Sequence, residues 1–304
     1  LVHVKMLSEV VPSCGTDAAI NHIVPLLSSL VADPESIIRQ HLALQLLPMS
    51  TSCLSSKISE NPLPSPERGY KLVTDVILPH LTKLLSDPDQ DVRKASSDSI
   101  AGLAAHIQPK DVNRLILHIP IRLSQEDTRP AAGGGGKKQA QNNTVLPTGA
   151  PDGEDLRVTA AALLGELSPS LGPELVHQFV TPTLLSLSQD LAFRVRKSAA
   201  QAIPHAIAST TLADVEARLL PAFVSLSRDE VYRVRKTCAE CMVDMSRGIV
   251  ALKGSCERVL EFRRKELIPL AMRLLEDGNK FVRQGMMQFL GPFIASFFPL
   301  SNGG

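Results

Sequence analysis

Two short motifs in the 304-residue sequence contain residue types that could support chemistry. Residues 133–138 (GGGGKK) are similar to a phosphate-binding loop, but Ala131 stands where its first glycine belongs and Lys138 where its metal-binding Ser or Thr belongs. Cys238 and Cys241 form a C-x-x-C pair. A redox or zinc site at this pair would need a helix that follows a strand, or a second pair of ligands. We therefore predict neither a nucleotide site nor a metal site.

The remaining reactive residue types form no catalytic pattern. The eight histidines are scattered, and no H-E-x-x-H or G-x-S-x-G stretch is present. Cys238 and Cys241 fall on the same apolar helix face as Val234 and Met245, so we interpret them as packing residues. The sequence predicts a protein that binds rather than reacts, without a cofactor and not an enzyme.

Basic residues cluster where four predicted second helices begin, near Arg93, Arg194, Arg233 and Lys280. Aromatic residues stand beside two of these clusters, Phe193 and Tyr232. Stacking of the helices would align these clusters into a stripe along one edge. An aromatic ring beside a cation is typical of protein interfaces, so we predict that the stripe binds a partner protein. Its residues are Phe193, Arg194, Lys197, Tyr232, Arg233, Lys236 and Lys280.

The clusters lie within an internal repeat, and such a repeat decides the fold. A proline is followed five residues later by leucine, eight later by aspartate, and fourteen later by an arginine that follows valine or isoleucine. The complete frame starts at Pro25, Pro79, Pro182, Pro221 and Pro269.

Apolar residues recur at spacings of three and four on both sides of the aspartate. Val215, Leu219 and Phe223 precede one such aspartate, and Val234 and Cys238 follow it. Each repeat is therefore predicted to be two amphipathic helices joined by a turn at the aspartate. We expect the aspartate to cap the second helix, and the proline to kink the first.

The arginine of the frame lies near the start of the second helix. We predict that it pairs with the aspartate of its own repeat or of the adjacent repeat. One arginine in each repeat would then be structural and would not contact a partner. The residues of this ladder are Asp87, Arg93, Asp190, Arg196, Asp229, Arg235, Asp277 and Arg283.

The frame predicts an all-α fold, an α-α superhelix of about six full repeats after a partial first repeat within residues 1–14. We expect one elongated domain over residues 1–304, because a repeat array grows by adding units. A Pro/Ser-rich linker is predicted at residues 50–68. A Gly-rich insertion at residues 128–153 has almost no large apolar residue, so we expect it to be disordered. The insertion follows Asp127, which stands one residue before the expected position of the turn aspartate.

Composition narrows the function classes. The net charge of +1, an aromatic content of 4% and the absence of Trp argue against nucleic-acid and membrane surfaces, and against a DNA-base glycosylase built on helical repeats. Five cysteines do not make a secreted disulfide framework, so we expect a cytoplasmic protein, with the nucleus as a second location. Residues 289–300 form the longest apolar run, which is too short and too broken by proline to span a membrane.

The helical pairs with an aspartate turn resemble HEAT repeats. Two stretches, residues 231–241 (VYRVRKTCAEC) and residues 281–294 (FVRQGMMQFLGPFI), go beyond the generic frame. They resemble the amino-terminal HEAT region of the regulatory subunit 1 family of protein phosphatase 4, which is similar to the scaffold subunit of protein phosphatase 2A. This specific resemblance covers mainly the last hundred or so residues.

The resemblance implies a non-catalytic subunit. It would hold a serine/threonine protein phosphatase catalytic subunit of the phosphatase 4 or 2A kind and present phosphoprotein substrates to it. The repeat frame also permits a second function, a general HEAT adaptor in transport or in the assembly of another complex.

Overall fold

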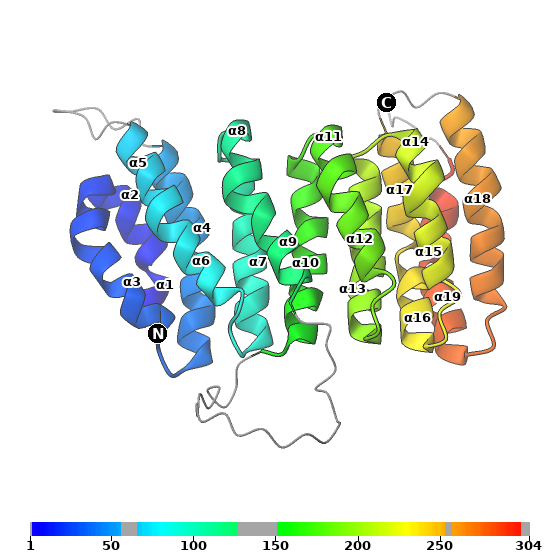
Figure 1. Cartoon of the computed structure of the whole chain (residues 1–304), viewed down its shortest axis with the longest axis horizontal. Coiled ribbons are helices and arrows are strands. Elements are labelled where there is room, and N and C mark those ends of the chain that lie inside the picture. Colours follow the sequence, from blue (N-terminus) through cyan, green and yellow to red (C-terminus); the bar gives the residue numbers. More distant parts are fainter. Residues whose placement is uncertain (1, 56–65, 127–150, 253–256, 299–304) are drawn as a thin grey trace, which may run out of the picture. The chain divides into compact units, whose positions relative to one another are not determined.

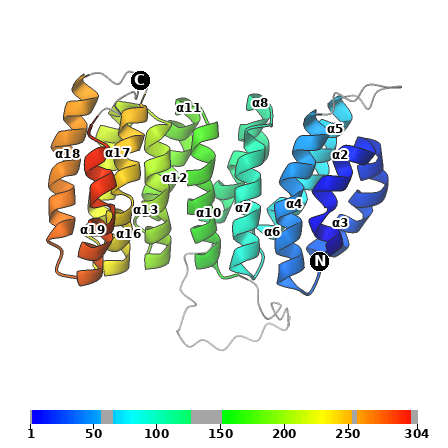
Figure 2. The same cartoon turned by 180° about the vertical axis from the view of Figure 1, so that it is seen from behind.

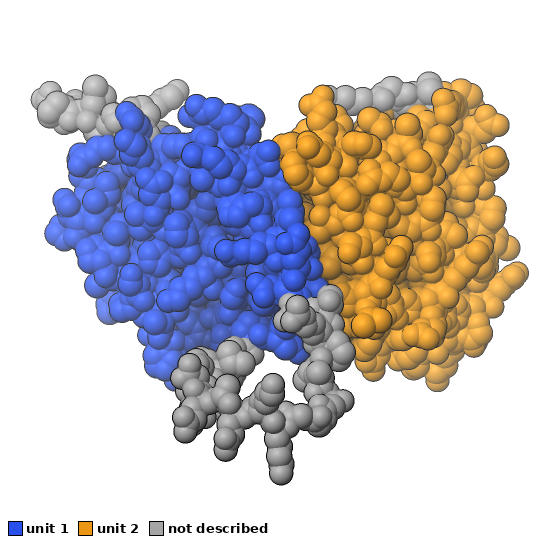
Figure 3. Space-filling model, in the orientation of Figure 1, with its two compact units in different colours: residues 1–159 blue, residues 160–304 orange. Residues whose placement is uncertain are grey.

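The computed structural model describes residues 2–55, 66–126, 151–252 and 257–298, and all regular elements in these ranges are helical. This confirms the predicted all-α class. The chain divides into two compact units, residues 1–159 and 160–304 (Figure 3). Each unit is built from pairs of helices, so we describe each by itself.

In unit 1, each first helix consists of α-helical parts separated by a short π-helical part, which we call η. Figure 1 labels the α-helical parts. Its elements are α1 (Val2–Lys5), α2 (Leu7–Ala18), η1 (Ala19–Ile23), α3 (Val24–Val31), α4 (Ser36–Ser55), α5 (Pro66–Leu72), η2 (Val73–Ile77), α6 (Leu78–Leu84), α7 (Gln90–Ala104), α8 (Pro109–Val112), η3 (Asn113–Leu117), α9 (His118–Ser124) and α10 (Gly153–Leu167), whose last residues belong to unit 2.

Unit 2 continues the same alternation. Its first helices α12 and α15 lie nearest the viewer in Figure 1, and its second helices α13, α16 and α17 lie nearest in Figure 2. Its elements are η4 (Ser168–Ser170, a 3-10 turn), α11 (Pro173–Leu175), η5 (Val176–Val180), α12 (Thr181–Leu187), α13 (Phe193–Ala208), α14 (Leu212–Asp214), η6 (Val215–Leu219), α15 (Leu220–Leu226), α16 (Tyr232–Glu240), α17 (Met242–Ala251), α18 (Glu257–Leu275) and α19 (Lys280–Ala295).

The core of each unit lies between paired helices, on the faces that the apolar spacing predicts. In the repeat formed by η6, α15 and α16, Leu219 and Phe223 of the first helix are fully buried, as are Val234 and Cys238 of the second helix. α13 and α17 approach so closely at Gly248 that an added Cβ would lie 2.9 Å from the backbone oxygen of Pro204. Helix pairing therefore rests on apolar burial and, at this position, on the absence of a side chain.

The frame prolines follow a change in helical winding. Pro25, Pro79, Pro182 and Pro221 are each the second residue of the α-helical part that follows a π-helical part. The residue before Pro79, Leu78, donates its N–H to the carbonyl five residues earlier instead of four. A wider turn makes room for the proline ring, which in a regular α-helix collides with the carbonyl four residues back. We predicted a kink at the proline but not this local π-helix, and Pro269 lies within α18 without one.

The prediction that the frame aspartate caps the second helix is wrong in position. The residue at the N-cap lies two positions later, as Asp89 does in α7 and Asn279 in α19. The frame aspartate instead accepts a hydrogen bond from the backbone N–H of that N-cap residue, at 2.8 Å between Asp277 and Asn279. The turn needs these two extra residues to reverse the chain, so the aspartate stabilises the turn while the residue two positions later stands at the N-cap.

Two predicted boundaries also differ. The helix α4 continues through residues 50–55, and α5 begins at Pro66, so only residues 56–65 of the predicted linker lie outside the described structure. Ser50 and Ser52 donate their hydroxyl groups to helix carbonyls four residues earlier, which satisfies polar side chains inside a helix. At the amino-terminal end, α2 continues to Ala18 and leads directly into η1, so no turn separates a partial repeat near Cys14.

The repeat that holds the predicted insertion keeps the geometry of its neighbours. The Arg157 Nη1 donates to the Glu126 carbonyl across 31 residues, and the Arg93 Nη1 makes the same bond to the Asp87 carbonyl across six. Glu126 therefore occupies the turn position that we assigned to Asp127. Asp127 and most of the predicted insertion lie outside the described residues, but α10 begins at Gly153, within the predicted range.

No helix in the described parts of the chain is both long enough and apolar enough to cross a membrane.

Candidate partner-binding groove

The ladder arginines of unit 2 each connect two repeats. Arg196 donates from Nε and Nη2 to the two carboxylate oxygens of Asp229 in the next repeat, at 2.6 and 3.0 Å. Its Nη1 donates to the carbonyls of Asp190 and Leu191 in its own turn. Arg235 repeats the two-oxygen contact with Asp277, at 2.8 and 3.0 Å. The sequence left two partners open for each arginine, the aspartate of its own repeat and that of the adjacent repeat. In the structure, Arg196 and Arg235 pair with the carboxylate of the adjacent repeat.

These ion pairs shift the pKa of both partners. The hydrogen bond to Asp277 is the main cause that raises the pKa of Arg235, and the same bond lowers the pKa of Asp277. For Asp229, burial acts to raise the pKa, but hydrogen bonds from Arg196 and from the backbone N–H of Val231 outweigh it and lower the pKa. The carboxylates of Asp229 and Asp277 are therefore held in their charged form.

The ladder of unit 1 is regular at one step and altered at the next. Arg39 contacts the Asp87 carboxylate through two bonds, at 2.6 and 2.9 Å. Arg93 instead pairs with Asp155 at 3.5 Å, and its buried Nε has no hydrogen-bond partner in the described residues. In the repeat that follows Arg93, Glu126 occupies the position of the turn aspartate. Arg93 pairs instead with the carboxylate of Asp155 on α10.

The last ladder arginine, Arg283, is exposed. It donates to the carbonyls of Asp277 and Gly278 in its own turn, as the other ladder arginines do. Within the described ranges, no carboxylate lies within ion-pair distance of its guanidinium. Arg283 thus makes half of the contacts that Arg235 makes, which provides a natural control.

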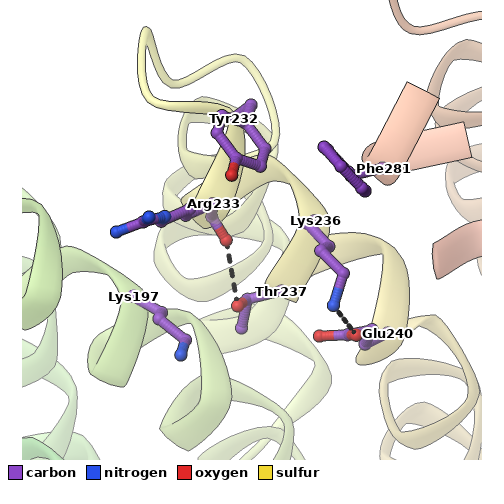
Figure 4. A pocket seen from close by; sticks show the side chains of 7 residues that line it. All are labelled: Lys197, Tyr232, Arg233, Lys236, Thr237, Glu240 and Phe281. Atoms are coloured by element: carbon purple, nitrogen blue, oxygen red, sulfur yellow. Dashed lines mark hydrogen bonds and ion pairs between the residues drawn. The ribbon is translucent and has the colours of Figure 1, made fainter. Parts of the chain in front are cut away.

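Beside the ladder, unit 2 contains a groove of about 270 Å³ along the first turns of its second helices (Figure 4). The α16 residues that line it fall at spacings of one, three and four, so they share one helix face. The neighbouring helices α13 and α19 each contribute one lining residue. The lining residues are Lys197, Tyr232, Arg233, Lys236, Thr237, Glu240 and Phe281.

Aromatic rings and cations alternate along this groove. Tyr232 and Phe281 are stacked with their ring centroids 5.8 Å apart. The Arg233 guanidinium lies 5.8 Å from the Phe193 ring and 6.0 Å from the Tyr232 ring, and the Lys280 ammonium lies 5.1 Å from the Phe281 ring. Such cation–π contacts hold the cations beside the rings without neutralising them.

The structure brings six of the seven predicted partner-binding residues into this region. Lys197, Tyr232, Arg233 and Lys236 line the groove, while Phe193 and Lys280 support it through ring contacts. Arg194 is exposed but does not line the groove. We expected both aromatic residues to be exposed, but Phe193 and Tyr232 are half-buried because cations and a second ring cover them.

Three lining residues were missed from the sequence: Thr237, Glu240 and Phe281. Phe281 stands two residues before its frame arginine, whereas Phe193 and Tyr232 stand three before theirs. An aromatic residue at the start of three successive second helices was a usable signal. The signal is weak because Phe281 stands at a different distance from its arginine than Phe193 and Tyr232 do from theirs.

The C-x-x-C pair lies in the core and not at a surface. Cys238 and Cys241 are buried and free. Burial raises the pKa of Cys241 to about 12 and raises the pKa of Cys238 well above its usual value. No group of three or more His, Cys, Asp or Glu side chains in the described structure is arranged to hold a metal ion.

The fold and the groove together define a helical repeat protein with a cationic and aromatic surface. The HEAT repeat family model matches residues 77–107 and 219–249. The solved structures of Kap95p with RanGDP and of the Kap95:Nup1 complex are similar, each with a TM-score of 0.65 and 13% identity. They cover 99% and 96% of this chain, and this chain covers 34% and 33% of theirs. At this identity the likeness shows the fold alone.

The chain is also similar in sequence to the serine/threonine-protein phosphatase 4 regulatory subunit 1. It is 25% identical to the protein from Rattus norvegicus over 294 residues, and 25% identical to that from Homo sapiens over 285 residues. These matches cover 96% and 93% of this chain and 26% of each relative, so the chain spans about a quarter of their length. The resemblance is confirmed, and the matches extend over nearly the whole chain.

Proposed function

We propose that this chain is a non-catalytic regulatory scaffold that binds a serine/threonine protein phosphatase catalytic subunit and presents phosphoprotein substrates to it. The observation that carries this proposal is the similarity to phosphatase 4 regulatory subunit 1 over nearly the whole chain. A helical repeat array supports the role physically, because its repeats offer a long surface for partners.

The groove is the surface that we assign to partner binding. It combines exposed cations with half-buried aromatic rings, and interfaces concentrate their binding energy on such residues. The ladder arginines are already engaged with carboxylates and carbonyls of the protein itself, so their role in this proposal is structural. The free thiols of Cys53, Cys238 and Cys241 suit a cytoplasmic or nuclear location, which we propose for the same protein.

The test is capture of a phosphatase by the immobilised 304-residue chain. Purified phosphatase 4 and phosphatase 2A catalytic subunits are offered separately, and bound protein is measured by immunoblot and by dephosphorylation of a phosphopeptide. We expect the chain to retain at least one of them. Retention of neither, while the folded chain captures a transport cargo or a small GTPase from extract, would favour the general adaptor and contradict the proposal.

A further inference from the structure

The groove carries more positive charge than its surroundings neutralise. Lys197, Arg233 and Lys280 have no carboxylate within ion-pair distance among the described residues, and Lys236 pairs with Glu240 at 2.6 Å. The groove lining thus holds three cations and one carboxylate, an excess of two positive charges. Lys280, beside the Phe281 ring, adds a third positive charge next to the groove. The carboxylates of the neighbouring ladder do not offset this excess, because the ladder arginines already pair with them.

The aromatic residues provide an apolar surface between these cations. The Tyr232 and Phe281 rings stack at an interplanar angle of 29°, and Phe281 remains 44% exposed. Figure 4 shows Phe281 facing the groove from one side and Lys197 from the other, with Lys236 between them. A ligand that fits this arrangement carries negative charge on both sides of an apolar side chain.

The cations come from three successive second helices and do not converge on one point. Lys197 lies on α13, Arg233 and Lys236 on α16, and Lys280 on α19. One phosphate group would need several donors around a single centre. Cations spread over three helices instead match several single charges spread along a chain. Packed helices lie roughly 8–10 Å apart, and three residues of an extended chain span about 10 Å.

From this geometry we propose that the groove binds an extended acidic peptide segment of a partner protein. Its carboxylates recur about every third residue, with an aromatic or aliphatic residue between them. The inference rests on the partner-binding role proposed above and specifies the chemistry of the partner. Acidic side chains meet Lys197, Arg233 and Lys280, and the apolar side chain packs against the Tyr232–Phe281 pair.

Fluorescence anisotropy with the full 304-residue chain and labelled peptides tests this directly. The probe is Glu-Ala-Phe-Glu-Ala-Phe-Glu, and a matched peptide carries Gln at every Glu. A third peptide carries one phosphoserine and no Glu. We expect only the acidic probe to bind, with an affinity that falls as salt is raised. Equal binding of the Gln peptide would overturn the proposal, and so would binding of the phosphoserine peptide at least as tight as that of the probe.

Two charge-matched double variants locate the site. Lys197→Glu with Arg233→Glu should weaken binding of the probe about tenfold, because two surface charge contacts become repulsive. Lys83→Glu with Lys110→Glu makes the same change in net charge at exposed positions of unit 1 and should leave binding unchanged. Equal weakening by both pairs would show attraction to overall charge and would refute a built groove.

A third variant keeps the test decisive if a charge reversal disturbs the fold. Phe281→Ala should weaken binding of the probe but not of a peptide in which Ala replaces each Phe. If Phe281→Ala weakens neither peptide, the apolar part of the proposal is wrong. These titrations contain no phosphatase, so a negative result leaves the proposed phosphatase binding untouched.

Discussion

The ladder makes a quantitative prediction because two of its arginines share their turn contacts but differ in whether they bind a carboxylate. Arg235 and Arg283 both donate to two carbonyls of their own turn, but only Arg235 also donates to a carboxylate, that of Asp277. The Arg235 and Asp277 side chains are 18% and 11% exposed. Substitution of each arginine by alanine therefore separates the ion pair from the turn contacts.

The expected magnitudes follow from this geometry. Arg283→Ala loses two exposed hydrogen bonds to carbonyls, which costs roughly 1 kcal/mol. Arg235→Ala loses the equivalent pair and also leaves a mostly buried carboxylate without its counter-charge. Removing one partner of a buried ion pair costs about 3–5 kcal/mol. Because the Arg235–Asp277 pair is partly exposed, we expect the lower end of this range, about 3 kcal/mol. The two losses together cost Arg235→Ala about 4 kcal/mol. With about 2 °C per kcal/mol for a chain of this size, Tm should fall by roughly 8 °C for Arg235→Ala and roughly 2 °C for Arg283→Ala.

Thermal unfolding followed by circular dichroism at fixed pH and ionic strength measures both shifts. A double-mutant cycle with Asp277→Ala should give a coupling energy of roughly 1–2 kcal/mol between Arg235 and Asp277. If the two arginine variants lower Tm equally, or the coupling is near zero, the carboxylate contact does not stabilise the stack and the reasoning fails.

The fold makes three further predictions. The lowered pKa of Asp277 stabilises the folded state above the unfolded-state pKa of about 3.9, and this contribution is lost as pH falls through the lower folded pKa. On acidification, the unfolding free energy of wild type should therefore fall more steeply than that of Asp277→Asn. Urea unfolding at several pH values measures this, and equal pH slopes for the two proteins would contradict the prediction. Gly248→Ala should destabilise the protein by roughly 1–3 kcal/mol, because its Cβ meets a backbone oxygen of α13. Gly291→Ala has open space around its Cβ and should stabilise the protein by up to about 1 kcal/mol. The reverse order of stability in urea unfolding would refute the close helix contact. Cys238 and Cys241, with raised pKa values, should resist iodoacetamide at pH 8 until the chain is unfolded, and alkylation of the native protein detected by mass spectrometry would contradict their burial.

Much of the fold could be predicted because the same residue spacing occurs in several repeats. The spacing from Pro221 to Asp229 and Arg235 defines two helices and one turn, and the same spacing recurs at other positions. Apolar residues at helical spacing then identify the buried faces correctly, as Phe223 and Val234 show. Repetition removes the ambiguity that a single short helix would leave.

The local backbone was harder to predict. A π-helical part is a small change in winding that depends on how the proline ring fits its neighbours, and no residue pattern distinguishes Pro221, which has one, from Pro269, which does not. The extension of α4 through Ser50 and Ser52 was missed because polar composition suggests a loop. Their hydroxyl groups find partners on the helix itself, which composition cannot show.

The groove was predicted only in part for a related reason. Helical spacing on α16 places Tyr232, Arg233 and Lys236 near one another, because local geometry is enough. Contacts across repeats, such as that between Tyr232 and Phe281, depend on the relative rotation of two helices. That rotation is set by packing along the whole interface, so the sequence frame alone could not place Phe281 in the groove.

We propose that the groove binds the partner while the ladder stabilises the fold. The most direct measurement compares capture of the phosphatase catalytic subunit by wild type and by Arg233→Glu with Lys236→Glu, with Tm recorded for each protein. We predict a loss of capture of about tenfold or more with Tm within about 2 °C of wild type. Unchanged capture by the reversed groove would contradict the account.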